Sequence, residues 1–234
     1  MRRSLALVPA TAVLAVALTA CVSGSAAPAT PEPLETAAAW LDSGRLIAVT
    51  TVGSSSCVPI AEAAELQPDG SVRVELIDPV GLGGSARACT ADLVPRVSLV
   101  GVPEGVDPAQ DLRIEVVYGI AAGTAAIPGA PSLAGPGSGT DHAPSASWVG
   151  SDAGLVFLTW GSSSCAPVIE DVAATAPAEV TVTFATPAAD RVCTLDMAPR
   201  AGLAADPGVE TRAGAQLVLS GDTFDAVRVP IVGS

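Results

Sequence analysis

Short stretches in which apolar and polar residues alternate recur along this chain. The run from Val72 to Leu76 alternates strictly, and the run from Val180 to Phe184 does the same. A period of two predicts strands with one buried face and one solvated face. The run from Arg45 to Val52 is rich in branched residues, which also favour strands.

Further segments lead to a mainly β prediction. Residues 154–160 are the counterpart of the 45–52 run, and residues 112–116 and 227–229 are expected to form closing strands. No segment shows a long helical period, although the Ala-rich residues 61–66 suit a short helix. About five short strands in each half of the chain predict small modules of the β-sandwich or β-barrel kind.

An internal repeat divides the chain into two copies. Gly-Ser-Ser-Ser-Cys occurs at residues 53–57 and again at 161–165, and Cys-Thr-x-Asp-x-x-Pro-Arg occurs at 89–96 and again at 193–200. We therefore predict a first β module over residues 40–120 and a second over 148–234. The sequence leaves open whether the copies are independent or fused into one pseudo-symmetric unit.

Two segments are expected to lie outside the modules. Residues 121–147 consist almost wholly of Ala, Gly, Pro, Ser and Thr, which are too small or polar to fill a core, so we predict a linker there. Residues 21–39 are small and rich in Pro, which predicts a semi-extended tether ahead of the first module.

The N-terminus has the pattern of an export signal. Two arginines precede an apolar run over residues 5–17, followed by Leu18-Thr19-Ala20-Cys21. These features predict a secretory signal over residues 1–20. The last four residues resemble the bacterial lipobox, and this resemblance implies that Cys21 receives lipid after cleavage and anchors the protein on the extracytoplasmic face of the cell membrane. Two or more acyl chains hold a protein stably at a bilayer. An ordinary cleaved signal and an uncleaved anchor remain the alternatives.

The four other cysteines fit two disulfides. Each copy must close on itself if the repeat is symmetric, which pairs Cys57 with Cys89 and Cys165 with Cys193. Export makes oxidation of these thiols the expected state. A zinc site is the alternative, although the spacing contains no Cys-x-x-Cys pair.

Charge excludes several classes of function. The chain has a formal net charge of −13, and all 11 of its basic residues are Arg. Such an acidic chain cannot neutralise a run of phosphates, so we expect no nucleic-acid partner. The absence of Lys excludes a P-loop lysine and a Schiff-base lysine. We expect no cofactor and no metal site.

The repeated polar residues are the candidate site. They are expected either to satisfy the backbone beside the disulfides or to form a groove for a polar or anionic ligand. Arg prefers bidentate pairing with carboxylate, so the structural interpretation pairs Asp92 with Arg96 and Asp196 with Arg200. Glu62 and Glu170 fit either interpretation. The candidates in the two copies are Ser54, Ser55, Ser56, Asp92 and Arg96, and Ser162, Ser163, Ser164, Asp196 and Arg200.

A catalytic function is less favoured than a binding function. A hydrolase would use a serine of one triplet with His142 and Asp141, but no Gly-x-Ser-x-Gly elbow is present and the histidine lies in the predicted linker. We expect a non-catalytic binding or envelope-organising module whose partner is an envelope protein or a polar ligand. A hydrolase and a passive spacer are the alternatives. The two repeated motifs are similar to exported modules of uncharacterised proteins in high-GC bacteria, a resemblance that implies no activity.

Overall fold

The computed structural model describes residues 30–80, 87–150 and 154–233, and it confirms the mainly β prediction. Among these residues the only helical element is a short 3-10 turn, η1 (Asp42–Gly44). The strands are β1 (Glu32–Pro33), β2 (Ala37–Leu41), β3 (Leu46–Gly53), β4 (Ile60–Leu66), β5 (Val72–Ile77), β6 (Val94–Gly101), β7 (Leu112–Tyr118), β8 (Ala121–Ile127), β9 (Ser145–Trp148), β10 (Leu155–Gly161), β11 (Ile169–Ala176), β12 (Glu179–Phe184), β13 (Ala198–Ala204), β14 (Gln216–Gly221) and β15 (Phe224–Val232).

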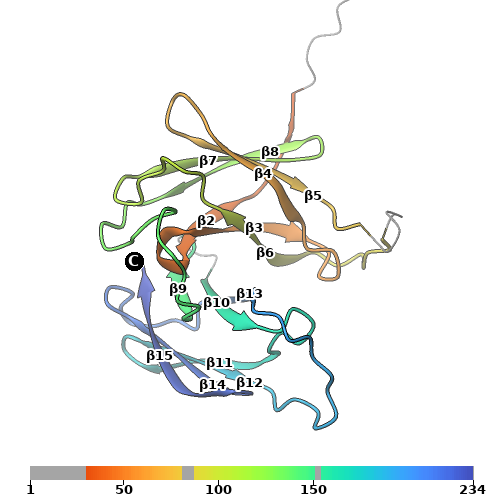
Figure 1. The fold of residues 1–234 in the computed structure, drawn as a ribbon, viewed down its shortest axis with the longest axis vertical. Helices are drawn as coiled ribbons and strands as arrows, with labels where there is room; N and C mark the ends of the chain where they lie inside the picture. The colour runs from red at the N-terminus through yellow and green to blue at the C-terminus, as the bar shows by residue number, and fades with distance from the viewer. Residues whose placement is uncertain (1–29, 81–86, 151–153, 234) are drawn as a thin grey trace, which may run out of the picture. The chain divides into compact units, whose positions relative to one another are not determined.

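The two copies repeat one strand order. The first copy has an outer sheet in the order β1-β8-β7-β5-β4 and an inner sheet in the order β2-β3-β6. In the second copy the row β15-β14-β12-β11 corresponds to the outer sheet, and the row β9-β10-β13 corresponds to the inner sheet. The two rows form a single sheet there, because β15 also pairs with β9. In both copies the pair at the centre of the outer sheet is parallel, β5 with β7 and β12 with β14. Figure 1 shows the resulting layers of strands one above another.

Each copy buries an apolar core between its inner and outer strands. In the first copy, Trp40 and Ile47 of the inner sheet pack with Val74 and Ile114 of the outer sheet, and all four are essentially inaccessible to solvent. In the second copy the core includes Trp148, Leu155, Val182 and Leu217. The alternation seen in the sequence is the cause, because every second residue of these strands faces the core.

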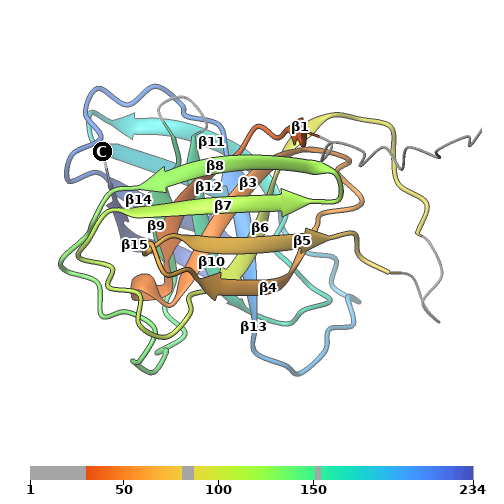
Figure 2. The ribbon, with the colours of Figure 1, turned by 90° about the horizontal axis from the view of Figure 1, so that it is seen from above.

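A third core joins the two copies. Ala39, Leu41 and Ala48 of the first copy are buried together with Val156 and Leu158 of the second. These residues occupy the faces of the two inner sheets that point away from each copy's own core. The residues Pro31–Ser234 accordingly form one compact unit, which selects the fused arrangement of the two that the sequence left open. Figure 2 shows the outer strands β4, β5, β7 and β8 of the first copy running across its inner strands β3 and β6 when seen from above.

Three expectations about local structure need correction. Residues 61–66 form a strand within β4 and not a short helix, because they pair with β5 across a bulge. The segment 37–39, expected in the tether, belongs to β2, where Ala38 and Ala39 are buried. Residues 121–127 and 145–147, expected in the linker, form β8 and most of β9. Ala125 and Ile127 complete the first core, and Ala146 belongs to the second. The predicted signal over residues 1–20 and the lipidation residue Cys21 lie outside the described residues.

Candidate functional site

The serine triplet of the first copy surrounds a threonine that the sequence analysis did not single out. The Oγ1 atom of Thr90 lies 2.8 Å from Ser54 Oγ and 3.2 Å from Ser56 Oγ. The same hydroxyl donates a hydrogen bond to the Asp92 carboxylate, which also accepts the backbone N–H of Ser55 at 3.2 Å. The repeat already marked Thr90, because it lies within the duplicated Cys-Thr-x-Asp motif.

The second copy builds the same cluster. Thr194 Oγ1 lies 2.8 Å from Ser162 Oγ and donates to the Asp196 carboxylate. The backbone N–H of Ser163 donates to Asp196 at 3.1 Å, and the N–H of Thr194 donates to Ser164 Oγ at 3.1 Å. The predicted serines and aspartates therefore do come together, and their hydroxyls bond mainly to one another.

These hydrogen bonds lower the pKa of both aspartates. The hydroxyl of Thr90 is the main cause for Asp92, followed by Ser55, and together they lower its pKa to about 2. Thr194 and Ser163 lower the pKa of Asp196 to about 2 in the same way. Both carboxylates are consequently ionised at any physiological pH, where they act as hydrogen-bond acceptors and not as general acids.

Arg96 holds the first serine loop from inside the protein. It is only 7% exposed, and its Nη1 donates to the carbonyl oxygens of Cys57 at 2.7 Å and Ser54 at 3.4 Å, while its Nε donates to Thr51 Oγ1. The expected ion pair with Asp92 is not formed. Arg96 belongs to the inward-facing row of β6, whereas Asp92 precedes that strand and bonds to the serine loop.

Arg200 plays the corresponding part in the second copy. Its Nη2 donates to the carbonyl oxygen of Trp160 at 2.8 Å, and its Nη1 donates to that of Cys165 at 3.1 Å. The expected pair with Asp196 is likewise not formed, and among the described residues neither arginine lies within ion-pair distance of a carboxylate. Both arginines therefore support the loops that carry the serines.

Two disulfides fix the other side of these loops, as the repeat predicted. Cys57 is bonded to Cys89 and Cys165 to Cys193, with Cα–Cα distances of 5.5 and 5.6 Å. The first cysteine of each bridge is buried and the second is exposed. Within the described ranges no group of His, Cys, Asp or Glu has the arrangement of a metal site.

The residues that a hydrolase would need are not assembled. His142 is exposed and packs edge-on against the ring of Trp160, with 4.8 Å between ring centroids. In the part of the chain that the structure describes, no hydrogen bond joins its ring to either serine triplet. Glu62 and Glu170, which fitted either interpretation, are exposed on β4 and β11 and make no hydrogen bond to the clusters there.

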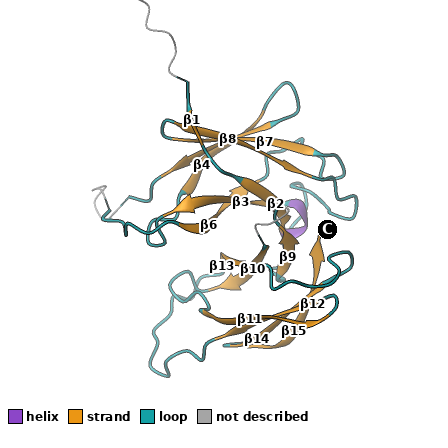
Figure 3. Ribbon diagram, turned by 180° about the vertical axis from the view of Figure 1, so that it is seen from behind, coloured by secondary structure: helices purple, strands orange, loops and turns teal. Residues whose placement is uncertain are grey.

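Large apolar side chains are exposed beside both disulfides. Leu93 is 79% exposed and Val192 is 91% exposed. We call the whole set the disulfide face: Val58, Ile60, Leu93, Val168, Val192, Leu195 and Met197. Apart from Ile60, the first residue of β4, these residues lie on loops, and the loops come from both copies. A cavity of about 320 Å³ is lined jointly by residues of both copies, among them Val58, Arg96, Ala166, Pro167 and Arg200. Figure 3 shows the loops that connect the strands of the two copies.

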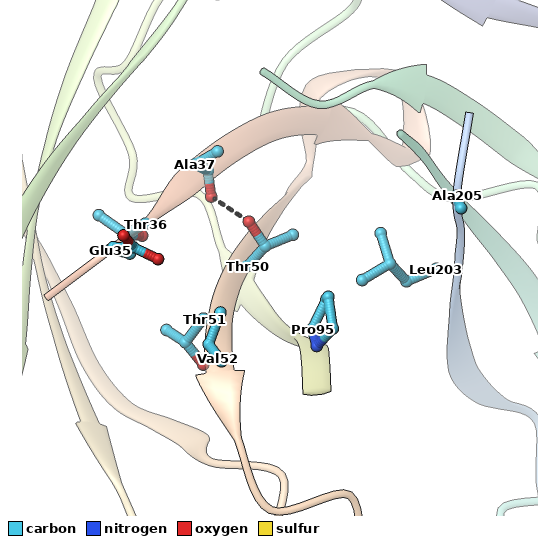
Figure 4. Close-up of a pocket in the computed structure, with 9 residues that line it drawn as sticks. All are labelled: Glu35, Thr36, Ala37, Thr50, Thr51, Val52, Pro95, Leu203 and Ala205. Atoms are coloured by element: carbon cyan, nitrogen blue, oxygen red, sulfur yellow. Dashed lines mark hydrogen bonds between the residues drawn. The ribbon is translucent and has the colours of Figure 1, made fainter. Parts of the chain in front are cut away.

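A larger cleft of about 530 Å³ lies along the seam between the copies. Figure 4 shows Leu203 and Ala205 of the second copy facing Thr50 and Pro95 of the first. The hydroxyl of Thr50 donates to the carbonyl oxygen of Ala37 at 3.2 Å and is thereby satisfied within the protein. The cleft consequently offers mainly apolar surface.

Comparison with family models, with curated proteins and with solved structures finds no match for this chain. Among the described residues there is no helix that is long and apolar enough to cross a membrane.

Proposed function

We propose that this protein is a non-catalytic binding module, anchored by lipid on Cys21 at the extracytoplasmic face of the membrane, that holds an envelope protein through the disulfide face. The observation that carries the proposal is the exposure of seven large apolar side chains, on loops and at the start of β4, beside two disulfides and the arginines that hold the serine loops. Exposed apolar patches on a folded protein mark interaction surfaces.

The chemistry of this face favours a protein over a lipid surface as the partner. The apolar residues alternate with the hydroxyl clusters and with Asp92 and Asp196, both of which stay ionised. Anionic headgroups repel carboxylates, so the face is poorly suited to lie on a bilayer. A protein surface with apolar side chains and a few hydrogen-bond donors matches both parts of the face.

The serine clusters support a binding role over hydrolysis. Their hydroxyls bond to Thr90 and Thr194, and the carboxylate beside each threonine is an acceptor that is already engaged. A nucleophilic serine needs a base within hydrogen-bond reach. His142 instead packs against Trp160.

The membrane anchor is tested by replacing its attachment residue. In the Cys21→Ser variant we expect the protein to lose its acylation and either to leave the membrane fraction or to accumulate with its signal uncleaved. Fractionation and mass spectrometry of the N-terminus measure both outcomes. Recovery of a processed Cys21→Ser protein in the membrane fraction would contradict the anchor.

The partner surface is tested by site-specific photocrosslinking in intact cells. A photoreactive residue at position 93 is expected to give a discrete protein adduct, which the Leu195→Asp/Met197→Asp variant should reduce at least tenfold, because residues at the centre of an interface dominate its energy. Both substituted residues are exposed, so the free energy of unfolding should change by less than about 0.5 kcal/mol for each.

Leu66 offers the matched control, because it is a partly exposed apolar residue at the other end of β4 from the disulfide loops. A photoreactive residue at that position should give no such adduct, and Leu66→Asp should leave the adduct at position 93 intact. Equal crosslinking from both positions, or adducts to lipid alone, would refute the proposed surface.

A further inference from the structure

In the first copy one side chain covers the buried Arg96, and the residue at the matching position of the second copy is different. In the first copy Tyr118 is the last residue of β7 and lies opposite Leu76 of β5. In the second copy the repeat places Phe184 at the position of Leu76, and Phe184 lies opposite Gly221 of β14. The sheet register therefore shows that Gly221 stands where the first copy has Tyr118.

The tyrosine closes the first copy over its arginine. The Arg96 guanidinium carbon lies 5.6 Å from the centre of the Tyr118 ring, and the tyrosine hydroxyl donates to the carboxylate of Asp78. This arrangement places an aromatic face over the cation and leaves Arg96 almost fully buried.

The second copy is open at the same place. A cavity of about 400 Å³ is lined by Trp160, Ser162, Arg191, Arg200 and Asp222, among other residues. Gly221 has a φ of +81°, and a Cβ built there would lie 2.2 Å from the carbonyl oxygen of Phe184. No side chain at position 221 can therefore close this cavity without moving the backbone.

The charges around this cavity are not balanced within the protein. Arg200 has an Nε atom that is buried without a hydrogen-bond partner, and the guanidinium of Arg191 makes one hydrogen bond among the described residues, from its Nη2 to the carbonyl oxygen of Ala166 at 2.9 Å. Neither arginine lies within ion-pair distance of a carboxylate among the described residues. Asp222 is the one acidic residue of the lining, so two cations face one anion.

The pKa of Arg200 reflects the same surroundings. Burial is the main cause that lowers it, the negative charge of Asp222 opposes this effect, and the positive charge of Arg191 adds to it. Arginine nonetheless remains ionised in proteins, so this cavity contains a partly desolvated cation.

From this geometry we propose that the cavity over Arg200, which we call the Arg200 pocket, binds the carboxylate of a small polar ligand. A carboxylate accepts two parallel hydrogen bonds from a guanidinium, and Nη1 and Nη2 of Arg200 each carry a second N–H besides the one that donates to a carbonyl oxygen. The excess of a single positive charge favours a monoanion over a doubly charged phosphate. This site does not rest on the proposed protein-binding role, because it needs neither the disulfide face nor a membrane anchor.

Binding can be followed at the pocket itself by NMR. The full-length protein in detergent at low ionic strength is titrated with glycolate and glucuronate, with glycolamide and glucose as the uncharged counterparts and with inorganic phosphate as a third probe. We expect the carboxylates to shift the indole N–H of Trp160 and the Nε–H of Arg200 in a saturable way, while the indole signals of Trp40 and Trp148 stay in place.

Three variants test the charges of the Arg200 pocket. Arg191→Gln should weaken carboxylate binding at least fivefold, and Asp222→Asn should strengthen it several-fold, since asparagine tolerates the left-handed backbone of Asp222 (φ +50°). Arg87→Gln alters the matching residue of the closed copy and should leave the affinity unchanged. Equal shifts with the uncharged probes, tighter binding of phosphate, or equal effects of Arg87→Gln and Arg191→Gln would each overturn the proposal.

Discussion

Replacing Cys57 and Cys89 together by alanine is expected to lower the free energy of unfolding by about 3–4 kcal/mol. The bridge spans a sequence separation of 32 residues, and closing a loop of that size restricts the unfolded chain by roughly this amount in the chain-entropy model. The Cys165 and Cys193 pair spans 28 residues and should contribute a similar amount. Loss of both bridges would then remove about 6–8 kcal/mol, to be compared with the stability typical of a domain, which is about 5–15 kcal/mol.

Urea unfolding of the full chain followed by tryptophan fluorescence measures this effect. Trp40 is buried in the first core and Trp148 in the second, so each copy has an internal reporter. Peptide mapping without reduction confirms the pairing in the parent protein. An unfolding midpoint that is unchanged in the Cys57→Ala/Cys89→Ala variant would contradict the prediction, and Val80→Ala is a suitable control because Val80 is exposed.

Strands with large apolar residues could be predicted from the sequence, and strands made of small residues could not. The alternation in residues 72–76 and 180–184 predicted β5 and β12 correctly. The Ala-rich residues of β2, β4 and β8 gave no such signal, because alanine fits a helix, a loop or a strand. Hydrogen-bonded pairing with a neighbouring strand decides the structure of these segments. For example, β8 pairs with β7 from Ala121 to Ile127.

The members of the candidate site were predictable, but their partners were only partly so. The duplicated motifs identified the serines, the aspartates, the arginines and both disulfides. The spacing of four residues between Asp92 and Arg96 suggested an ion pair, but in β6 it places Arg96 in the buried row with Ser98 and Val100. Charge pairing across such a spacing is typical of helices and not of strands.

The divergence of the two copies was also beyond the reach of the sequence. The repeat aligns the chain well up to the second disulfide cysteine and the arginine that follows, but Tyr118 and Gly221 lie in strands that share no motif. Only the pairing of β7 with β5 and of β14 with β12 shows that these two residues are equivalent. Arg96 is covered by the ring of Tyr118, whereas Arg200 lines a further cavity within its own copy.

The last prediction follows from this difference between the two arginines. Arg96→Leu is expected to lower the free energy of unfolding by about 3 kcal/mol, because it leaves the carbonyl oxygen of Cys57 buried without a donor and removes two further hydrogen bonds of a charged group. Arg200→Leu should cost about 1–2 kcal/mol, because Arg200 is more exposed and its Nε has no partner to lose.

Arg96→Lys separates charge from geometry in the same urea experiment. Lysine keeps the positive charge but cannot place donors on Thr51 and Cys57 together, so we expect it to destabilise the protein nearly as much as leucine does. Gly53→Ala tests how closely Arg96 packs against the neighbouring strand β3, because a Cβ at Gly53 would lie 2.5 Å from the guanidinium carbon of Arg96. If Arg96→Lys retained full stability, charge alone would account for the role of Arg96. If Arg96→Leu and Arg200→Leu had equal effects, the extra hydrogen bonds and the deeper burial of Arg96 would have no energetic consequence.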